Sequence, residues 1–209
     1  MDFFTQCCKN SWISDFARAV VIAVAISATG FAVAQTTTEI SQFRVERADD
    51  DVLVSALVMF ELPPPVEDAL LKGVAMYFAL EADVLRERWY WYDKKVTNVE
   101  RRLRLAYLPL TRRWRLNVTS GVSPEGNVGL ALNQNFDTLA QALTSVKRVS
   151  GWKVAEFGDL DLGVKYKIEL RFRLDLSQLP RPFQIGAFGK DDWDIGASAV
   201  APLPVSTYK

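Results

Sequence analysis

The chain has 209 residues, 49% of them hydrophobic, and its 25 basic and 25 acidic residues give a formal net charge of zero. This length suffices for one well-buried domain, and a neutral chain has no net attraction to nucleic acid or to an anionic membrane. Histidine is absent and the two cysteines stand at positions 7 and 8, which excludes histidine-based catalysis and the usual zinc and haem ligand sets, so no cofactor is expected.

The first 34 residues predict an export signal. Arg18 precedes an apolar run at 19–28, and Ala32-Val33-Ala34 follows it. This order is typical of a secretory signal peptide, here cleaved before Gln35. The run is shorter than the ~20 residues that span a bilayer. We therefore expect a periplasmic protein whose mature chain has no cysteine. The alternative is an inner-membrane protein anchored by an uncleaved N-terminus.

The mature chain begins with elements typical of a β-sheet. Residues 38–60 predict a hairpin whose strands flank Asp49-Asp50-Asp51, and a turn is expected there rather than a cation site. Pro63-Pro64-Pro65 ends the second strand and begins a predicted short helix at 66–72. Alternating apolar residues then predict a strand at 74–84.

Four consecutive aromatic residues follow, and they are expected to continue in a strand: Trp89, Tyr90, Trp91 and Tyr92. Successive side chains of a strand point to opposite faces, so two of the four cannot face the core. The first interpretation is that they pack on the outer sheet or under a loop. The alternative is that they line a ligand surface.

Two regions predict strands with one apolar and one basic face. The hairpin at 99–118 and the strand at 164–175 place these cations outward: Arg102, Arg104, Arg113, Arg115, Lys165, Lys167, Arg171 and Arg173. Arginine binds phosphate and carboxylate groups in a bidentate fork. The residues are therefore candidates for binding an anionic envelope component or an acidic protein segment. The alternative is a solvated face on which Glu100, Glu169 and Asp175 pair across strands.

The remaining elements complete a mainly β pattern. We expect a short strand at 128–132 and a longer helix at 138–149, with a capping box of Thr138 and Gln141 and with Gly151 closing its end. The turn at 158–163 contains Asp159 and Asp161 but lacks the other ligands of a calcium loop, so no metal is expected.

These elements predict the fold class and the domain limits. The class is mainly β with a minor α component, an antiparallel β-sandwich or sheet with one short and one longer helix. A single β-rich domain is expected at 35–195, after the signal peptide at 1–34, and a loose tail is expected at 196–209.

The chain resembles the DUF4390 domain family, uncharacterised secreted proteins of beta-proteobacteria, in four motifs that occur in this order: Trp89-Tyr90-Trp91-Tyr92-Asp93, Arg113-Trp114-Arg115-Leu116, Phe136-Asp137-Thr138-Leu139 and Gln178-Leu179-Pro180-Arg181-Pro182. The resemblance covers nearly all of the mature chain. It implies secretion and a gene neighbourhood that often includes a membrane sensor histidine kinase of the nitrogen-regulation type. It implies no activity and no site residues.

The expected function is binding rather than catalysis, because no motif specifies a reaction. We expect an exported, non-enzymatic envelope interaction module, accessory to a membrane sensor kinase under the family's gene context. Its partner would be an envelope protein or an anionic envelope component and not nucleic acid, with membrane association only if the signal stays uncleaved. The alternative is a carboxylate-dependent periplasmic enzyme, such as a carbohydrate-active hydrolase.

Overall fold

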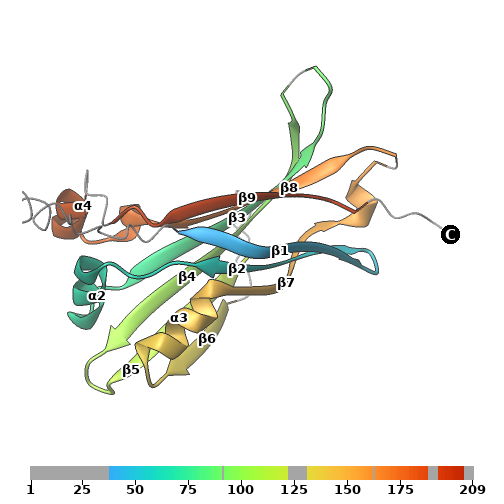
Figure 1. Ribbon diagram of the computed structural model, residues 1–209. Coiled ribbons are helices and arrows are strands. Elements are labelled where there is room, and N and C mark those ends of the chain that lie inside the picture. The colour runs from blue at the N-terminus through green and yellow to red at the C-terminus, as the bar shows by residue number, and fades with distance from the viewer. Residues whose placement is uncertain (1–37, 91, 122–130, 162, 188–192, 205–209) are drawn as a thin grey trace, which may run out of the picture. The chain divides into compact units, whose positions relative to one another are not determined.

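The computed structural model describes residues 38–90, 92–121, 131–161, 163–187 and 193–204, which form two antiparallel sheets (Figure 1). The smaller sheet has the order β1-β2-β7, with β1 at Glu39–Ala48, β2 at Asp51–Met59 and β7 at Arg148–Glu156. The larger has the order β6-β5-β4-β3-β8-β9, with strands at Ala131–Phe136, Arg113–Ser120, Lys94–Leu108, Met76–Arg86, Tyr166–Leu174 and Gly196–Pro202. The predicted mainly β fold is confirmed. The expected signal peptide lies outside the described residues.

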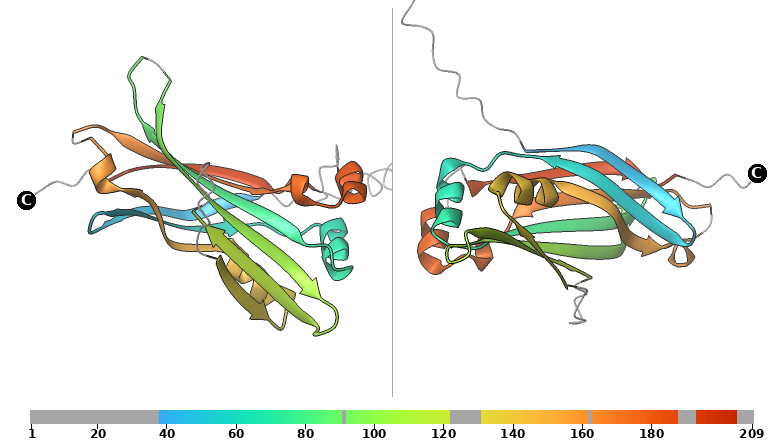
Figure 2. Two further views of the ribbon diagram at one scale, coloured as in Figure 1. Left: turned by 180° about the vertical axis from the view of Figure 1, so that it is seen from behind. Right: turned by 90° about the horizontal axis from the view of Figure 1, so that it is seen from below.

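One hydrophobic core joins the two sheets. The smaller sheet contacts β3, β4 and β9 of the larger one (Figure 2). Strict alternation in the sequence builds this core, since every second residue of β8 from Tyr166 to Leu174 is buried. Near one end of the core the rings of Phe60, Phe78 and Phe172 lie with centroids 5.2–5.7 Å apart. The apolar faces predicted from the sequence are therefore the faces that the sheets bury.

The β1–β2 hairpin turns at the aspartates, as predicted. Ala48 pairs with Asp51, so Asp49 and Asp50 form a two-residue turn, and Asp49 has a φ of 52°. Such turns require positive φ, which aspartate tolerates better than most residues. Asp51 forms an ion pair with Lys153 of β7 at 2.8 Å. This aspartate therefore ties the turn to the neighbouring strand.

The described residues also form three short helices, α2 (Pro64–Leu71), α3 (Leu139–Lys147) and α4 (Arg181–Ala187), with single 3-10 turns at Phe157–Asp159 and Leu176–Gln178. The helix α3 lies between the two sheets, in contact with β2, β5, β6 and β7. The predicted helix at 66–72 is confirmed, and it begins two residues earlier within the proline run. The sequence interpretation missed α4, where Pro182 occupies the first turn. Within the described ranges, no helix has the length and apolarity needed to cross a membrane.

The predicted helix at 138–149 is too long. The Thr138 hydroxyl accepts a hydrogen bond from the Gln141 amide at 3.3 Å, so the predicted cap is confirmed, but the helix ends at Lys147. Val149 pairs with Ala56 of β2, and Gly151 lies inside β7 with a φ of 55° instead of closing a helix. Pairing with a buried strand overrides the helical spacing of the apolar residues.

The C-terminal part of the domain is more ordered than predicted. The loose tail expected at 196–209 is wrong for residues 196–202, which form β9 along the edge of β8. The strand consists largely of small residues, and its register runs from Arg173 opposite Gly196 to Lys167 opposite Pro202. Backbone pairing rather than side-chain pattern therefore defines this strand. The strand predicted at 128–132 lies mostly outside the described residues, and β6 begins at Ala131.

Candidate functional site

The outer face of the six-stranded sheet carries the cations predicted from the sequence. Arg102 and Arg104 of β4 are exposed, whereas Leu103 between them is buried. Ala79 of β3 lies opposite both Arg102 and Arg173. The same alternation places these residues outward on β5 and β8: Arg113, Arg115, Lys167 and Arg171. Lys165 is exposed directly before β8. The strands thus bring the predicted residues to one face of the sheet.

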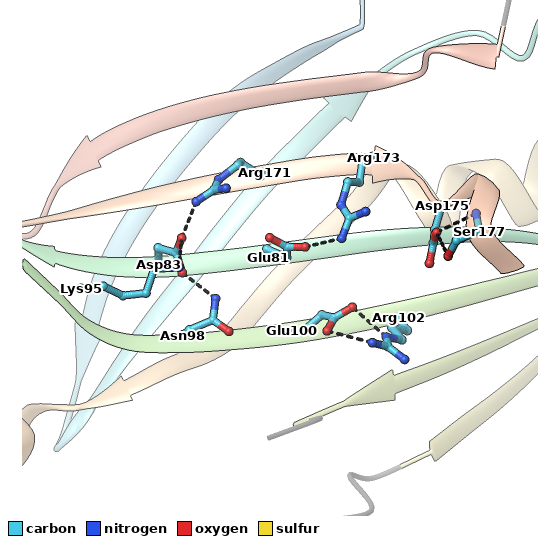
Figure 3. A network of polar contacts seen from close by, with 10 residues as sticks. All are labelled: Glu81, Asp83, Lys95, Asn98, Glu100, Arg102, Arg171, Arg173, Asp175 and Ser177. Carbon is cyan, nitrogen blue, oxygen red and sulfur yellow. Dashed lines mark hydrogen bonds and ion pairs between the residues drawn. The ribbon is translucent and has the colours of Figure 1, made fainter. Parts of the chain in front are cut away.

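Carboxylates from β3 and β4 interleave with these cations (Figure 3). Arg173 Nη2 lies 2.6 Å from Glu81 Oε1. Arg102 binds both oxygens of Glu100, at 2.7 and 3.2 Å. These hydrogen bonds raise the pKa of Arg102 and of Arg173. The outer face is therefore a network of opposite charges rather than a uniformly basic surface.

The expected pairing of Glu100, Glu169 and Asp175 across strands is wrong. Glu100 pairs with Arg102 of its own strand, and Glu169 lies 3.2 Å from Nε of Arg171, which also belongs to its own strand. Asp175 accepts hydrogen bonds from the amide and hydroxyl of Ser177 instead of pairing across strands. It therefore caps the turn that follows β8.

Asp83 is the centre of this network. Asp83 is 1% exposed, and no other charged residue among those described is buried. Its carboxylate accepts from Asn98 Nδ2 at 2.5 Å, lies 2.8 Å from Lys95 Nζ and bonds Arg171. A buried carboxylate requires such donors because it has lost its hydration. Sequence reasoning missed Asp83, although an acid at an outward position between two basic strands was a usable signal.

Three of the predicted cations have no carboxylate partner among the described residues. Arg104 donates from Nε to the Tyr77 hydroxyl at 3.1 Å, with its guanidinium 5.8 Å from the ring centroid. Arg115 Nε donates to the Asn135 side chain at 3.3 Å, and Lys165 is exposed. Arg113, by contrast, lies 3.5 Å from the exposed Asp137. Arg104, Arg113 and Arg115 thus lie on the paired strands β4 and β5, whereas Lys165 lies apart from them, before β8.

The aromatic segment lies in the loop between β3 and β4, at the projecting end of the hairpin (Figure 1). The expectation of a strand is wrong here, because β3 ends at Arg86 and β4 begins at Lys94. Trp89 is 92% exposed, Tyr90 72% and Tyr92 89%. The packing interpretation is therefore wrong for these three residues, and Trp91 lies outside the described residues. Ligand binding by this segment stays a prediction.

The exposed rings and Arg88 form one surface, which we call the aromatic loop (residues 88–90 and 92). The Trp89 and Tyr90 rings meet edge to face with centroids 4.8 Å apart. Together with Arg88 and Tyr92 they line a shallow concavity of about 450 Å³. Trp, Tyr and Arg are the residues most enriched at the energetic centres of protein interfaces.

Asp93 closes the base of the aromatic loop. Its carboxylate accepts from the Arg88 amide at 3.2 Å and lies 2.5 Å from Lys167 Nζ of β8. The Lys167 hydrogen bond and then the Arg88 amide lower the pKa of Asp93, and the same contact raises the pKa of Lys167. Lys167, a candidate binding residue of the basic face, thus connects the loop to the sheet through this ion pair.

The described residues do not assemble a metal site. No group of three acidic or cysteine side chains lies close enough to hold a metal ion within the described ranges. Of the two aspartates in the partial calcium motif, Asp161 forms an ion pair with Arg86 at 2.8 Å. The Asp161 carboxylate therefore already has a cationic partner.

Comparisons with known proteins identify one family. A family model described as a domain of unknown function, DUF4390, matches residues 35–201. No curated protein and no solved structure shows significant similarity to the chain.

Proposed function

The chain belongs to the DUF4390 family, and we propose that it is an exported, non-enzymatic interaction module of the cell envelope that binds a partner protein through the aromatic loop. One observation carries the proposal. Trp89, Tyr90 and Tyr92 expose 72–92% of their surface at the end of a projecting hairpin. Covering such exposed rings with a partner removes apolar surface from water, and this lowers the free energy of the complex.

The loop is built to present these rings rather than to bury them. The Asp93 carboxylate holds the Arg88 amide and Lys167, so the loop is attached at its base and on one side. A preorganised loop loses less conformational entropy on binding than a free one. Contiguous exposed apolar surface of this kind typically marks an interaction site.

The export signal and the family's gene context identify the partner to test first. A periplasmic chain meets the outer portions of inner-membrane proteins, and the resemblance described above implies a sensor kinase among the neighbouring genes. The mature N-terminus should be Gln35 if the signal is cleaved. Intact-mass measurement of the protein from cells tests this, and retention of residues 1–34 would instead support the anchor.

No observation on the described residues favours the alternative of a carboxylate-dependent enzyme. Glu81 and Glu100 lie opposite each other in the register of β3 and β4. Each of them is bound by an arginine on the outer face of the sheet, Glu81 by Arg173 and Glu100 by Arg102. The structure gives both carboxylates structural partners.

Site-directed photocrosslinking in intact cells tests the proposal. A crosslinker at Tyr90 should capture a specific envelope protein, and Trp89→Ala with Tyr92→Ala should abolish the capture. Leu110 provides a matched control, because it is fully exposed in the β4–β5 turn at another hairpin end. A crosslinker at Leu110 should not capture the same protein, and Leu110→Ala should leave capture by Tyr90 unchanged. Equal capture from both positions contradicts the proposal.

A further inference from the structure

A cavity of about 390 Å³ lies between the inner side of β4, β5 and β6 on one hand and α3 and β7 on the other. This volume is within the range of small-molecule sites, about 300–1,000 Å³. Most of its wall is apolar and consists of Leu103, Leu116, Val118, Leu132, Val146 and Val149. Leu132 remains 52% exposed at its margin. The smaller sheet, with three strands against six, leaves this part of the inner face to α3.

Arg101 places a positive charge in this apolar wall. It belongs to β4 between the inward-facing Val99 and Leu103, and its neighbour Arg102 faces outward. Its guanidinium stacks on the Trp152 ring at 4.8 Å, and Nε donates to the Ser120 hydroxyl at 3.0 Å. Among the described residues that line the cavity none is acidic, and among all those described no carboxylate forms an ion pair with Arg101.

A cation in this position is costly without a counter-charge. Burial lowers the pKa of Arg101, and no carboxylate raises it. The guanidinium has five N–H donors in a planar fork, and Nε is the one with a partner in the described structure. The remaining donors are suited to a planar carboxylate, which accepts two parallel hydrogen bonds. Arg148, also on the wall of the cavity, adds a second positive charge.

We propose that this cavity binds a single-chain anionic amphiphile of the fatty-acid class, with its carboxylate on Arg101 and its alkyl chain along the apolar residues of β4, β5 and β6. Charge complementarity commits the site to an anion, and the apolar wall commits it to an aliphatic chain. The inference is independent of the aromatic loop, which lies at the β3–β4 end of the larger sheet.

Fluorescence titration of the protein as isolated from cells tests the proposal, because Trp152 stacks on Arg101 and reports on its surroundings. Laurate is the probe, and dodecanol and inorganic phosphate supply its chain and its charge separately. Laurate should bind saturably. Dodecanol and phosphate should each bind about tenfold more weakly or not at all, because each lacks one of the two contacts.

Substitutions localise the binding. Arg101→Gln should weaken laurate binding about tenfold, since a charge-assisted bidentate contact is lost. Arg104→Gln is the matched control, because Arg104 lies on the outer face of the same strand and bonds Tyr77 rather than a carboxylate. It should bind laurate like the unaltered protein.

A second variant keeps the test valid if Arg101→Gln alters folding. Val118→Trp fills the cavity from β5 without changing its charge, and it should also block laurate binding. Native mass spectrometry measures the binding of laurate to this variant, because the added tryptophan changes the fluorescence. Absence of saturable binding, equal binding of laurate and dodecanol, or unchanged binding by Arg101→Gln would each overturn the proposal. None of these outcomes bears on the crosslinking from Tyr90, so the two proposals fail separately.

Discussion

Arg101 and Arg102 are neighbours in β4, but they meet opposite electrostatic conditions on the two faces of the sheet. Arg102 lies on the outer face and binds both oxygens of Glu100. Arg101 lies on the inner face, where the described structure offers an aromatic ring and a hydroxyl but no carboxylate. The outer face therefore balances its charges within the chain, and the inner face leaves one charge to be balanced by something else. Matched charges hold the sheet together, whereas an unmatched charge identifies a place for a ligand.

The largest effect is expected from the best-matched charge. Asp83→Ala removes the buried carboxylate that Arg171, Lys95 and Asn98 share, and only Arg171 keeps a second acid, Glu169. We expect the free energy of unfolding to fall by about 2 kcal/mol, less than for a fully buried pair because both cations are partly exposed. Urea denaturation measures this.

Glu169→Gln is the control for Asp83. It removes a second acid from Arg171, at 3.2 Å, in a more exposed position. The expected loss is about 0.5 kcal/mol or less. Equal effects of the two substitutions would show that Asp83 has no special role in the network.

Removing the unmatched charge of Arg101 should change the free energy of unfolding in the opposite direction. Arg101→Met removes a half-buried cation that lacks a carboxylate and keeps an apolar side chain against Trp152. Without added amphiphile, we expect the free energy of unfolding to rise by about 1 kcal/mol or less. Thermal denaturation measures this, and a marked loss of stability would mean that Arg101 is a structural residue like Asp83.

A smaller effect is expected from substituting the exposed cations of the β4–β5 hairpin. Arg104→Gln with Arg113→Gln removes exposed charges whose partners are Tyr77 and Asp137. The change in the free energy of unfolding should not exceed about 1 kcal/mol. If these arginines also bind an anionic partner, capture of that partner should weaken in the double variant and fall as salt rises. Salt-insensitive capture that survives the double substitution would exclude that role.

The smallest effect is local and depends on pH. The pKa of Asp93 lies below its ordinary value of 3.8, so its stabilising contacts are fully present above pH 3.8 and are lost as the pH falls through the lowered pKa. The protection factor of the Arg88 amide against hydrogen exchange should then fall while β8 stays protected. Asp93→Ala, which removes the acceptor, should show fast exchange of this amide already at neutral pH. Slow exchange in that variant would contradict the role of Asp93 in holding the loop.

Alternation along the chain was sufficient to predict most of the fold and the faces of its strands. The apolar residues from Tyr166 to Leu174 correctly predicted the buried face of β8. Arg102 and Arg104 correctly predicted the exposed face of β4. The edge strand β9 was not predictable in this way, because its small residues show little contrast between faces. The end of α3 was also missed, since Val149 suits a helix by spacing and a strand only through Ala56.

The candidate sites were less accessible to sequence reasoning than the fold. The aromatic residues were noticed because four occur in succession, but their exposure depends on where β3 ends. The basic residues were found, whereas their partners Glu81 and Asp83 come from a strand that the register brings between β4 and β8. Sequence reasoning missed Arg101, which stands directly beside Arg102 in the chain. Only the cavity and the missing carboxylate distinguish it.

The register of the strands also determines when the chain can fold. Asp51 in β2 pairs with Glu156 in β7, and Phe78 in β3 pairs with Leu174 in β8. Both sheets thus close through contacts between residues far apart in the sequence, and such topologies fold slowly because loop entropy is lost before the contacts form. During synthesis the amino-terminal half has hairpins but no completed core. The native core can therefore close only after β8 has been made, so nearly the whole domain must be synthesised before both edges of β3 have their final neighbours.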